Sequence, residues 1–320
     1  MLKKTLILIL IVVVAGFAVD RFFHFGLLHN LNLKATYVTE GKIATNVLVD
    51  GPCEPLFTID PAYLQPKIGK TVYNLSLNHS DFADNFLHIH LYLKNNSAPQ
   101  YLFLYATPES FDTRFNTFHP YRFAAYLEDS IVASTIADND SVYAAWMKLP
   151  LLRYTYFGSQ LTFPAFQGWK HWMENKETPY FVNGHQPHPS ARSLENPLHF
   201  EVQLDEYGNK PEDASNKSFV WDKKREKYFR KILQIAQSKR IKVVVYESPG
   251  YSGILKTQAN RKEVLQKIKN TAEEYQVPYW VFDSLPTGDK KINFICPLIM
   301  NSSASKEFMD TLALRINKLR

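Results

Sequence analysis

Residues 44–62 read Ala-Thr-Asn-Val-Leu-Val-Asp-Gly-Pro-Cys-Glu-Pro-Leu-Phe-Thr-Ile-Asp-Pro-Ala, and this stretch decides the fold. The apolar run Val47–Val49 predicts a short buried strand, which ends at Gly51. Cys53, one of only two cysteines in the chain, lies on the turn that follows. Many α/β hydrolases raise their nucleophile on such a turn between a strand and the next helix. The pattern therefore predicts an α/β fold with a candidate catalytic position at Cys53.

Predicted strands and helices alternate on both sides of this turn. The helices begin at capping residues or show helical spacing of apolar side chains, and the strands are short apolar runs. Strands are predicted at 47–49, 72–75, 101–105, 242–246 and 279–282, and helices at 61–67, 82–93, 223–238, 260–276 and 303–319. The alternation predicts a five-stranded parallel sheet, flavodoxin-like, in a three-layer α/β/α sandwich. Ligands of such sheets bind at the carboxyl ends of the strands.

The segment 112–222 interrupts this alternation. It is rich in aromatic residues and histidine, and its proline-bounded pieces at 121–147 and 165–175 have helical character. Five prolines between 179 and 211 predict a long loop over 180–216. We therefore interpret 112–222 as a helical and loop insertion, or lid, within a domain that spans 43–320.

The N-terminus predicts export. Lys3 and Lys4 precede the apolar stretch Thr5–Val19, a pattern that keeps the N-terminus in the cytosol and carries the remaining chain across the membrane. The aromatic flank at 22–25 favours a retained membrane anchor over residues 1–22, although the short apolar run also suits a cleaved signal peptide. Residues 23–42 are then expected to form an extended stalk. The domain is expected on the extracytoplasmic, periplasmic side.

Composition narrows the classes of protein. The 320 residues are 45% hydrophobic and 21% charged, which is typical of a globular chain with a packed core. The net charge is +6, but the basic clusters at 223–225 and 290–291 are short and lack interleaved aromatics, so no nucleic-acid partner is expected. The sequence has no CxxC motif or His/Cys cluster, so no metal or other cofactor is expected.

Several blocks of the sequence resemble the SGNH/GDSL hydrolase superfamily, especially its membrane-anchored exported branch. Gly51-Pro52-Cys53 stands where that family has Gly-x-Ser with a serine nucleophile, and Ile59-Asp60-Pro61 resembles the helix start of the anchored members. Tyr73–Leu77 resembles their "YNLG" block, with Ser76 replacing the glycine that lines the oxyanion hole. Thr107–Phe111 occupies the place of the third block but lacks its asparagine.

The last block matters most for activity. The family has Asp-x-x-His before its final helix, and the segment Phe294–Asn301 fits that frame. The resemblance puts Cys296 at the position of the catalytic acid and Ile299 at the position of the base, so both functions are lost. A nucleophile in this arrangement needs a base and a group that orients it. His79, after the second strand, is the candidate substitute base; a solvated or capping loop histidine is the alternative.

The two cysteines allow three interpretations. They form a disulfide that locks a former active site, they are buried free thiols that fill space, or Cys53 is catalytic. Further candidate binding residues lie at the predicted strand ends: Glu54, Ser76, Asn78, Thr107 and Glu247. Paired carboxylates there also suit a glycosidase, but Glu247 and Asp283 are better suited to capping the following segments or holding loops.

The resemblance implies a role in the cell envelope. Its anchored members often accompany membrane-bound O-acyltransferases, so such an enzyme and a cell-surface glycan are the expected partners, together with the membrane. The main expectation is a catalytically degenerate accessory or binding protein in polysaccharide O-acylation. A Cys53-dependent esterase or O-acyltransferase acting on a surface glycan is the alternative, and a structural envelope protein is the third.

Overall fold

The computed structural model describes residues 2–114, 118–150, 152–186 and 218–319, and the chain divides into two compact units. Unit 1 comprises Met1–Lys42, Lys94–Asn96 and Phe118–Tyr180, and unit 2 comprises Ile43–Leu93, Ser97–Thr117 and Phe181–Arg320. A unit boundary falls between residues 42 and 43, where the sequence places the start of the main domain. Most of the described part of the expected insertion belongs to unit 1. The part of the expected loop over 187–216 lies outside the described residues.

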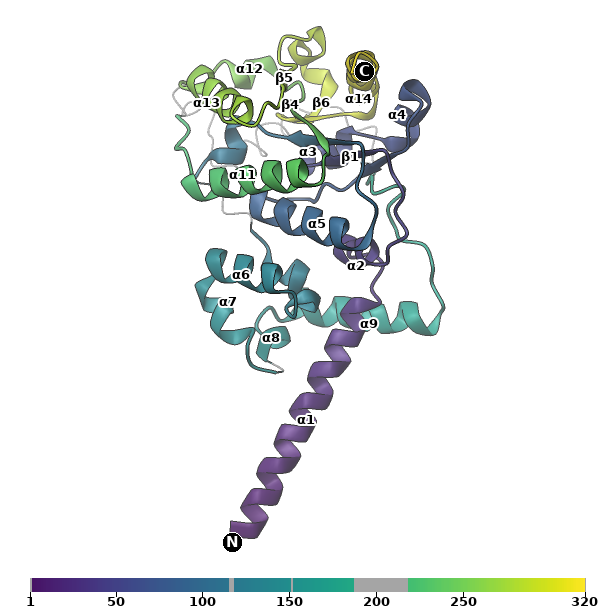
Figure 1. Cartoon of the computed structure of the whole chain (residues 1–320), viewed down its shortest axis with the longest axis vertical. Coiled ribbons are helices and arrows are strands. Elements are labelled where there is room, and N and C mark those ends of the chain that lie inside the picture. The colour runs from purple at the N-terminus through teal and green to yellow at the C-terminus, as the bar shows by residue number, and fades with distance from the viewer. Residues whose placement is uncertain (1, 115–117, 151, 187–217, 320) are drawn as a thin grey trace. The chain divides into compact units, whose positions relative to one another are not determined.

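Unit 2 is built on one parallel sheet (Figure 1). Its strands are β1 (Val47–Asp50), β2 (Val72–Asn74), β3 (Tyr101–Tyr105), β4 (Lys242–Glu247) and β5 (Tyr279–Val281). They are arranged in the order β2-β1-β3-β4-β5, and all four pairings are parallel. The predicted five-stranded parallel sheet is therefore confirmed.

Apolar side chains are buried on both faces of the sheet. Val47 and Val49 on β1 join a core cluster with helices α4 (Pro61–Ile68) and α14 (Ser302–Ile316). Leu48 points to the opposite face because side chains alternate along a strand, and it is also buried. Helices α5 (Phe82–Asn95) and α11 (Lys223–Ser238) contact each other through the rings of Phe82 and Phe229, 5.1 Å apart. Continuous apolar runs suit strands that are covered on both faces.

The helices of unit 2 begin where their capping residues lie. The Asp60 carboxylate accepts the Ala62 N–H at 2.8 Å, and Pro61 occupies the first turn of α4. Asp222 accepts the Lys224 N–H at 2.7 Å and so caps α11, which has the predicted bounds. Short elements that the sequence did not reveal are α3 (Cys53–Thr58), α12 (Ser252–Leu255), β6 (Phe294–Cys296) and β7 (Ile299–Met300). The remaining elements are the 3₁₀ helices η1 (Pro108–Phe111), η4 (Pro286–Asp289) and η5 (Lys291–Asn293), and helix α13 (Arg261–Glu273).

Unit 1 is helical. Helix α1 (Leu2–Leu28) is long and apolar enough to cross a membrane. The expected extended stalk is wrong over Lys34–Thr39, which forms helix α2. Leu31, Ala35 and Val38 recur at helical spacing, and burying them favours a helix over an extended chain. The other elements of unit 1 are η2 (Pro120–Tyr126), α6 (Ser130–Asn139), α7 (Ser141–Trp146), α8 (Leu152–Thr155) and α9 (Ser159–Met173).

Candidate functional site

The sheet topology points to the turn after β1. Strands β2 and β3 lie on opposite sides of β1, so the chain changes direction between β1 and β3. The crevice outside the carboxyl ends of two such strands is where open parallel sheets bind ligands. Here β1 ends at Asp50, directly before Cys53, and β3 ends at Tyr105, before Thr107 and Glu109.

The cysteine turn, residues 50–54, is fixed by close packing. A Cβ on Gly51 would lie 2.6 Å from the Cβ of Tyr105, so only glycine fits this position. The Asp50 carboxylate accepts the Gly51 N–H at 2.9 Å, and the Gly51 carbonyl accepts the Leu77 N–H at 3.0 Å. These contacts hold the β1 exit against the β2 exit.

An amide that the sequence analysis did not single out supports the same turn. The Asn74 side chain donates from Nδ2 to the carbonyls of Pro55 at 2.7 Å and Ile59 at 2.9 Å, and is fully buried. Its Oδ1 accepts the Ser76 N–H at 3.1 Å. Asn74 thereby ties the middle and the C-terminal end of α3 to the end of β2. The only sequence signal was its place in the "YNLG"-like block.

The Cys53 thiol begins α3 and is half-buried. Its Sγ donates to Asn78 Oδ1 at 2.8 Å and accepts the backbone N–H of His79 at 3.2 Å. Burial, together with the nearby Glu54 carboxylate, raises the pKa of Cys53 to about 12. The sulfur is therefore a protonated hydrogen-bond donor near neutral pH, and its contact with His79 runs through the main chain.

The last block of the resemblance folds beside this turn. Strands β6 and β7 form a short antiparallel hairpin, which carries Cys296 and Ile299, and α3 packs against β7. Cys296 is buried, and burial raises the pKa of its thiol to about 12. Both cysteines are free thiols, so the disulfide interpretation is wrong for this structure.

Two carboxyl groups share this edge of the sheet. Burial raises the pKa of Glu54 to about 7, and the Glu109 carboxylate adds to that rise. Glu109 Oε1 accepts a hydrogen bond from Gln258 at 2.6 Å, whereas its Oε2 is buried and has no hydrogen-bond partner among the described residues. The sequence marked Glu109 only as part of a block and did not reveal Gln258.

Glu247 has a structural partner. Arg261, the first residue of α13, lies 2.5 Å from Glu247 Oε1, and Tyr279 donates its hydroxyl to Oε2 at 3.2 Å. Arg261 also reaches Asp283 at 3.5 Å. Burial raises the pKa of Glu247 to about 7, and the Arg261 guanidinium opposes that rise. These bonds fit the loop-holding role that the sequence suggested for Glu247 and Asp283. The sequence did not reveal Arg261 as their partner.

The remaining candidates divide by exposure. Asn78 and His79 are exposed beside the Cys53 sulfur, and His79 adopts a left-handed backbone with φ of 48°. Ser76 and Thr107 are buried, at 0% and 1% exposure. Thr107 takes part in a capping box with Ser110 at the start of η1. The structure thus brings Cys53, Asn78 and His79 together and uses Thr107 for local structure.

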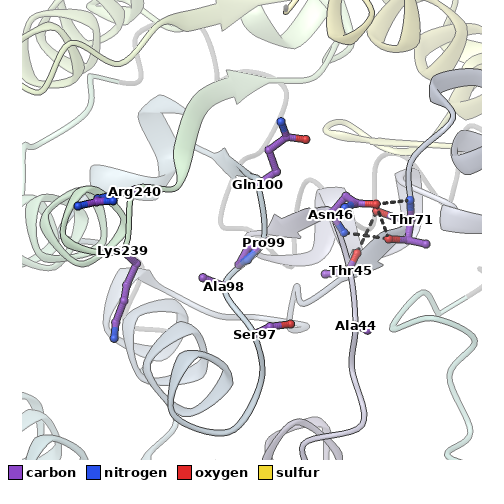
Figure 2. A pocket seen from close by; sticks show the side chains of 10 residues that line it. All are labelled: Ala44, Thr45, Asn46, Thr71, Ser97, Ala98, Pro99, Gln100, Lys239 and Arg240. Atoms are coloured by element: carbon purple, nitrogen blue, oxygen red, sulfur yellow. Dashed lines mark hydrogen bonds between the residues drawn. The ribbon is translucent and has the colours of Figure 1, made fainter.

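A separate hollow lies elsewhere on unit 2, at the amino ends of the strands (Figure 2). It has a volume of about 670 Å³ and is lined in part by Asn46, Thr71 and Gln100. Its polar groups already bond one another, since Asn46 Oδ1 accepts the Thr71 hydroxyl at 3.0 Å. Ligands of parallel sheets bind at the other edge, so this hollow is not the candidate site.

Within the described ranges, no group of three or more His, Cys, Asp or Glu side chains is placed to hold a metal ion. No protein-family model and no curated protein matches the chain. The interpretation of the site therefore rests on its geometry and on the sequence blocks.

Proposed function

We propose that this chain is a membrane-anchored, extracytoplasmic protein with an SGNH-like three-layer α/β/α domain. In this proposal it is a catalytically degenerate binding or accessory protein in the O-acylation of a cell-envelope polysaccharide. The strand order and the position of the cysteine turn at the β1 exit support the fold assignment. Lys3 and Lys4 before the apolar part of α1 support the orientation.

The state of the Cys53 thiol carries the proposal. Ester cleavage by a thiol needs a base that removes its proton and an acid that protonates the leaving group. The matching base position holds Ile299, on the hairpin against which α3 packs, and the thiol donates to a side-chain amide. A pKa of about 12 leaves almost no thiolate near neutral pH.

The same edge retains groups that suit a hydroxyl-rich ligand. A carboxyl group whose pKa is about 7, as for Glu54, both donates and accepts hydrogen bonds near neutrality. The Asn78 side chain is exposed beside the Cys53 sulfur. Polar groups of this kind orient a neutral sugar without requiring a charge on the ligand.

Restoring the missing groups tests the proposal. The full chain, Cys53→Ala and the triple variant Cys53→Ser/Cys296→Asp/Ile299→His are assayed for acetate release from an acetylated glycan. We expect the wild type and Cys53→Ala to match the buffer blank and the triple variant to gain activity. Cys53→Ser alone is the matched control, because it supplies the nucleophile without the base. Wild-type hydrolysis that Cys53→Ala abolishes would contradict the degenerate assignment.

One observation favours the second candidate, a Cys53-dependent esterase or O-acyltransferase. The His79 N–H points at Sγ from 3.2 Å, and such a bond stabilises a thiolate. That candidate requires an acyl-thioester on Cys53. Intact-mass analysis after incubation with an activated acetyl ester would reveal it, with Cys53→Ala as the blank. We expect no adduct.

A further inference from the structure

The end of α1 is built into unit 1. Apolar side chains up to Val19 are exposed along the helix, whereas Asp20, Gly26 and Leu27 are buried. Arg153 binds the Asp20 carboxylate through Nε at 2.9 Å and Nη2 at 2.5 Å. The helix therefore passes without a break from its exposed apolar stretch into a packed unit.

Helix α9 packs against α1 where the apolar stretch ends. A Cβ on Gly168 would overlap the carbonyl of Gly26, so the two backbones approach closely at a pair of glycines, as in membrane helix pairs. Trp169 Nε1 donates to the Phe22 carbonyl at 3.0 Å, three residues beyond Val19. Figure 1 shows the crossing of the two helices. Contact with the last turns of α1 places α9 at the end of the apolar stretch.

One face of α9 is apolar and uncovered. The opposite face, with Leu161, Ala165 and Gly168, is buried within unit 1. The uncovered face, called the α9 stripe, recurs at intervals of three and four residues and comprises Phe163, Phe166, Lys170 and Met173. Phe163 is 71% exposed and Met173 66%. Contiguous exposure of large apolar side chains marks an interaction surface.

The chemistry of the α9 stripe matches a lipid surface. The Phe166 ring lies 5.4 Å from the ring of Phe22 and 6.4 Å from that of Phe23, so the stripe continues the aromatic flank of α1. Aromatic side chains favour the membrane interface. Lys170, exposed within the stripe and 3.8 Å from Glu174 Oε1, is long enough to bring its ammonium group to lipid phosphates.

We propose that α9 lies in the interfacial region of the bilayer, with Phe163, Phe166 and Met173 immersed among the lipids. This inference rests on the proposal that α1 is a retained anchor. It replaces the expected extended stalk with a packed connection, because α1 and α9 are packed together at Gly26 and Gly168. Unit 1 is then held against the membrane by two elements, one that spans it and one that lies along it.

Depth-resolved quenching tests the inference on the full chain. Single cysteines replace Val12, Phe163, Met173 and Leu314 in a background with Cys53→Ala and Cys296→Ala, and each carries bimane. The proteins are placed, one chain per disc, in nanodiscs of phosphatidylcholine and phosphatidylglycerol. Lipids with nitroxides at the headgroup or mid-chain, and aqueous iodide, serve as quenchers. Leu314 on α14 is the matched control, since it is 66% exposed, like Met173, but is flanked by the exposed charged Arg315.

The outcomes separate the inference from the proposed anchor. We expect mid-chain nitroxide to quench the probe at 12, headgroup nitroxide to quench those at 163 and 173, and iodide to quench only the probe at 314. Quenching at 12 together with iodide access at 163 and 173 would overturn the inference and leave the anchor intact. Absence of quenching at 12 would refute the anchor, and the inference with it. Protection at 163 and 173 that appears only with several chains per disc would overturn the inference in favour of a second copy of the chain.

Discussion

Among the described residues, unit 2 encloses most of its apolar side chains, whereas unit 1 presents many of them. Unit 2 buries a large cluster that includes Phe103, Phe282 and Phe308 between its sheet and helices. Beyond α1, large exposed apolar side chains in unit 1 are Ile131, Val142, Trp146, Leu149, Tyr156, Phe163, Phe166, Trp172, Met173 and Tyr180, against Val182, Val220, Ile292 and Leu314 in unit 2. The exposed apolar surface of unit 1 costs free energy in water. The difference supports the proposed contact of unit 1 with the membrane.

Truncating an aromatic side chain should lower the free energy of unfolding much more in unit 2 than in unit 1. Phe308→Ala in unit 2 removes a fully buried ring that lies 5.1 Å from that of Phe282, so it should lower the free energy of unfolding by about 3–5 kcal/mol. Phe163→Ala in unit 1 should change it by less than about 0.5 kcal/mol in detergent. Denaturant unfolding of both variants provides the comparison. Equal losses would mean that the α9 stripe is covered by protein.

Thiol reactivity should also separate the units. A shift of the Cys53 pKa from the ordinary 9.0 to about 12 reduces the thiolate population roughly a thousandfold at pH 8. Iodoacetamide should therefore alkylate Cys53 about a thousandfold more slowly than a cysteine placed at Val142, which is 57% exposed in unit 1 and lies outside the α9 stripe, measured in detergent by mass spectrometry. The denatured chain, in which both thiols react at similar rates, is the control. Fast alkylation of native Cys53 would support the catalytic candidate.

The cysteine turn should give unit 2 a distinctive dependence of stability on pH. Glu54 has a pKa of about 7 in the fold and 4.5 as an ordinary glutamate, so its contribution to stability is fully present below pH 4.5 and is lost as pH rises through 7. The loss amounts to about 3 kcal/mol. Glu54→Gln should remove it, so the variant should gain stability over the wild type between pH 5 and 8. A difference that does not change with pH would show that Glu54 ionises as if in water.

The glycine contacts give the smallest expected effects. Gly51→Ala in unit 2 and Gly168→Ala in unit 1 each force neighbouring atoms apart, and each should cost about 1–3 kcal/mol in thermal or denaturant unfolding. Gly16→Ala on α1 is the control, because a Cβ there meets nothing within 4 Å. If Gly168→Ala proves neutral, α1 and α9 are not locked together, and the interfacial placement of α9 loses its rigid support.

The sequence predicted the central strands because their apolar runs are local signals. Strand Tyr101–Tyr105 has the predicted bounds because its apolar run is buried. Helix Lys223–Ser238 also has the predicted bounds, because Asp222 caps it and its apolar residues have helical spacing. The hairpin of β6 and β7 was missed because its strands are only three and two residues long. Arg261 was missed because its partners, Glu247 and Asp283, are brought to it only by the folded sheet.

By itself, the sequence determined the parallel sheet, the apolar N-terminal segment and the position of Cys53 at the exit of β1. These features depend on the spacing and polarity of neighbouring residues, which the chain carries before it folds. Only the tertiary structure decided that the thiol is held protonated and bonded to Asn78, and that both cysteines are free thiols. It alone also showed the α9 stripe beside the end of α1. Burial and distance between remote residues determine these properties, and no local pattern records either quantity.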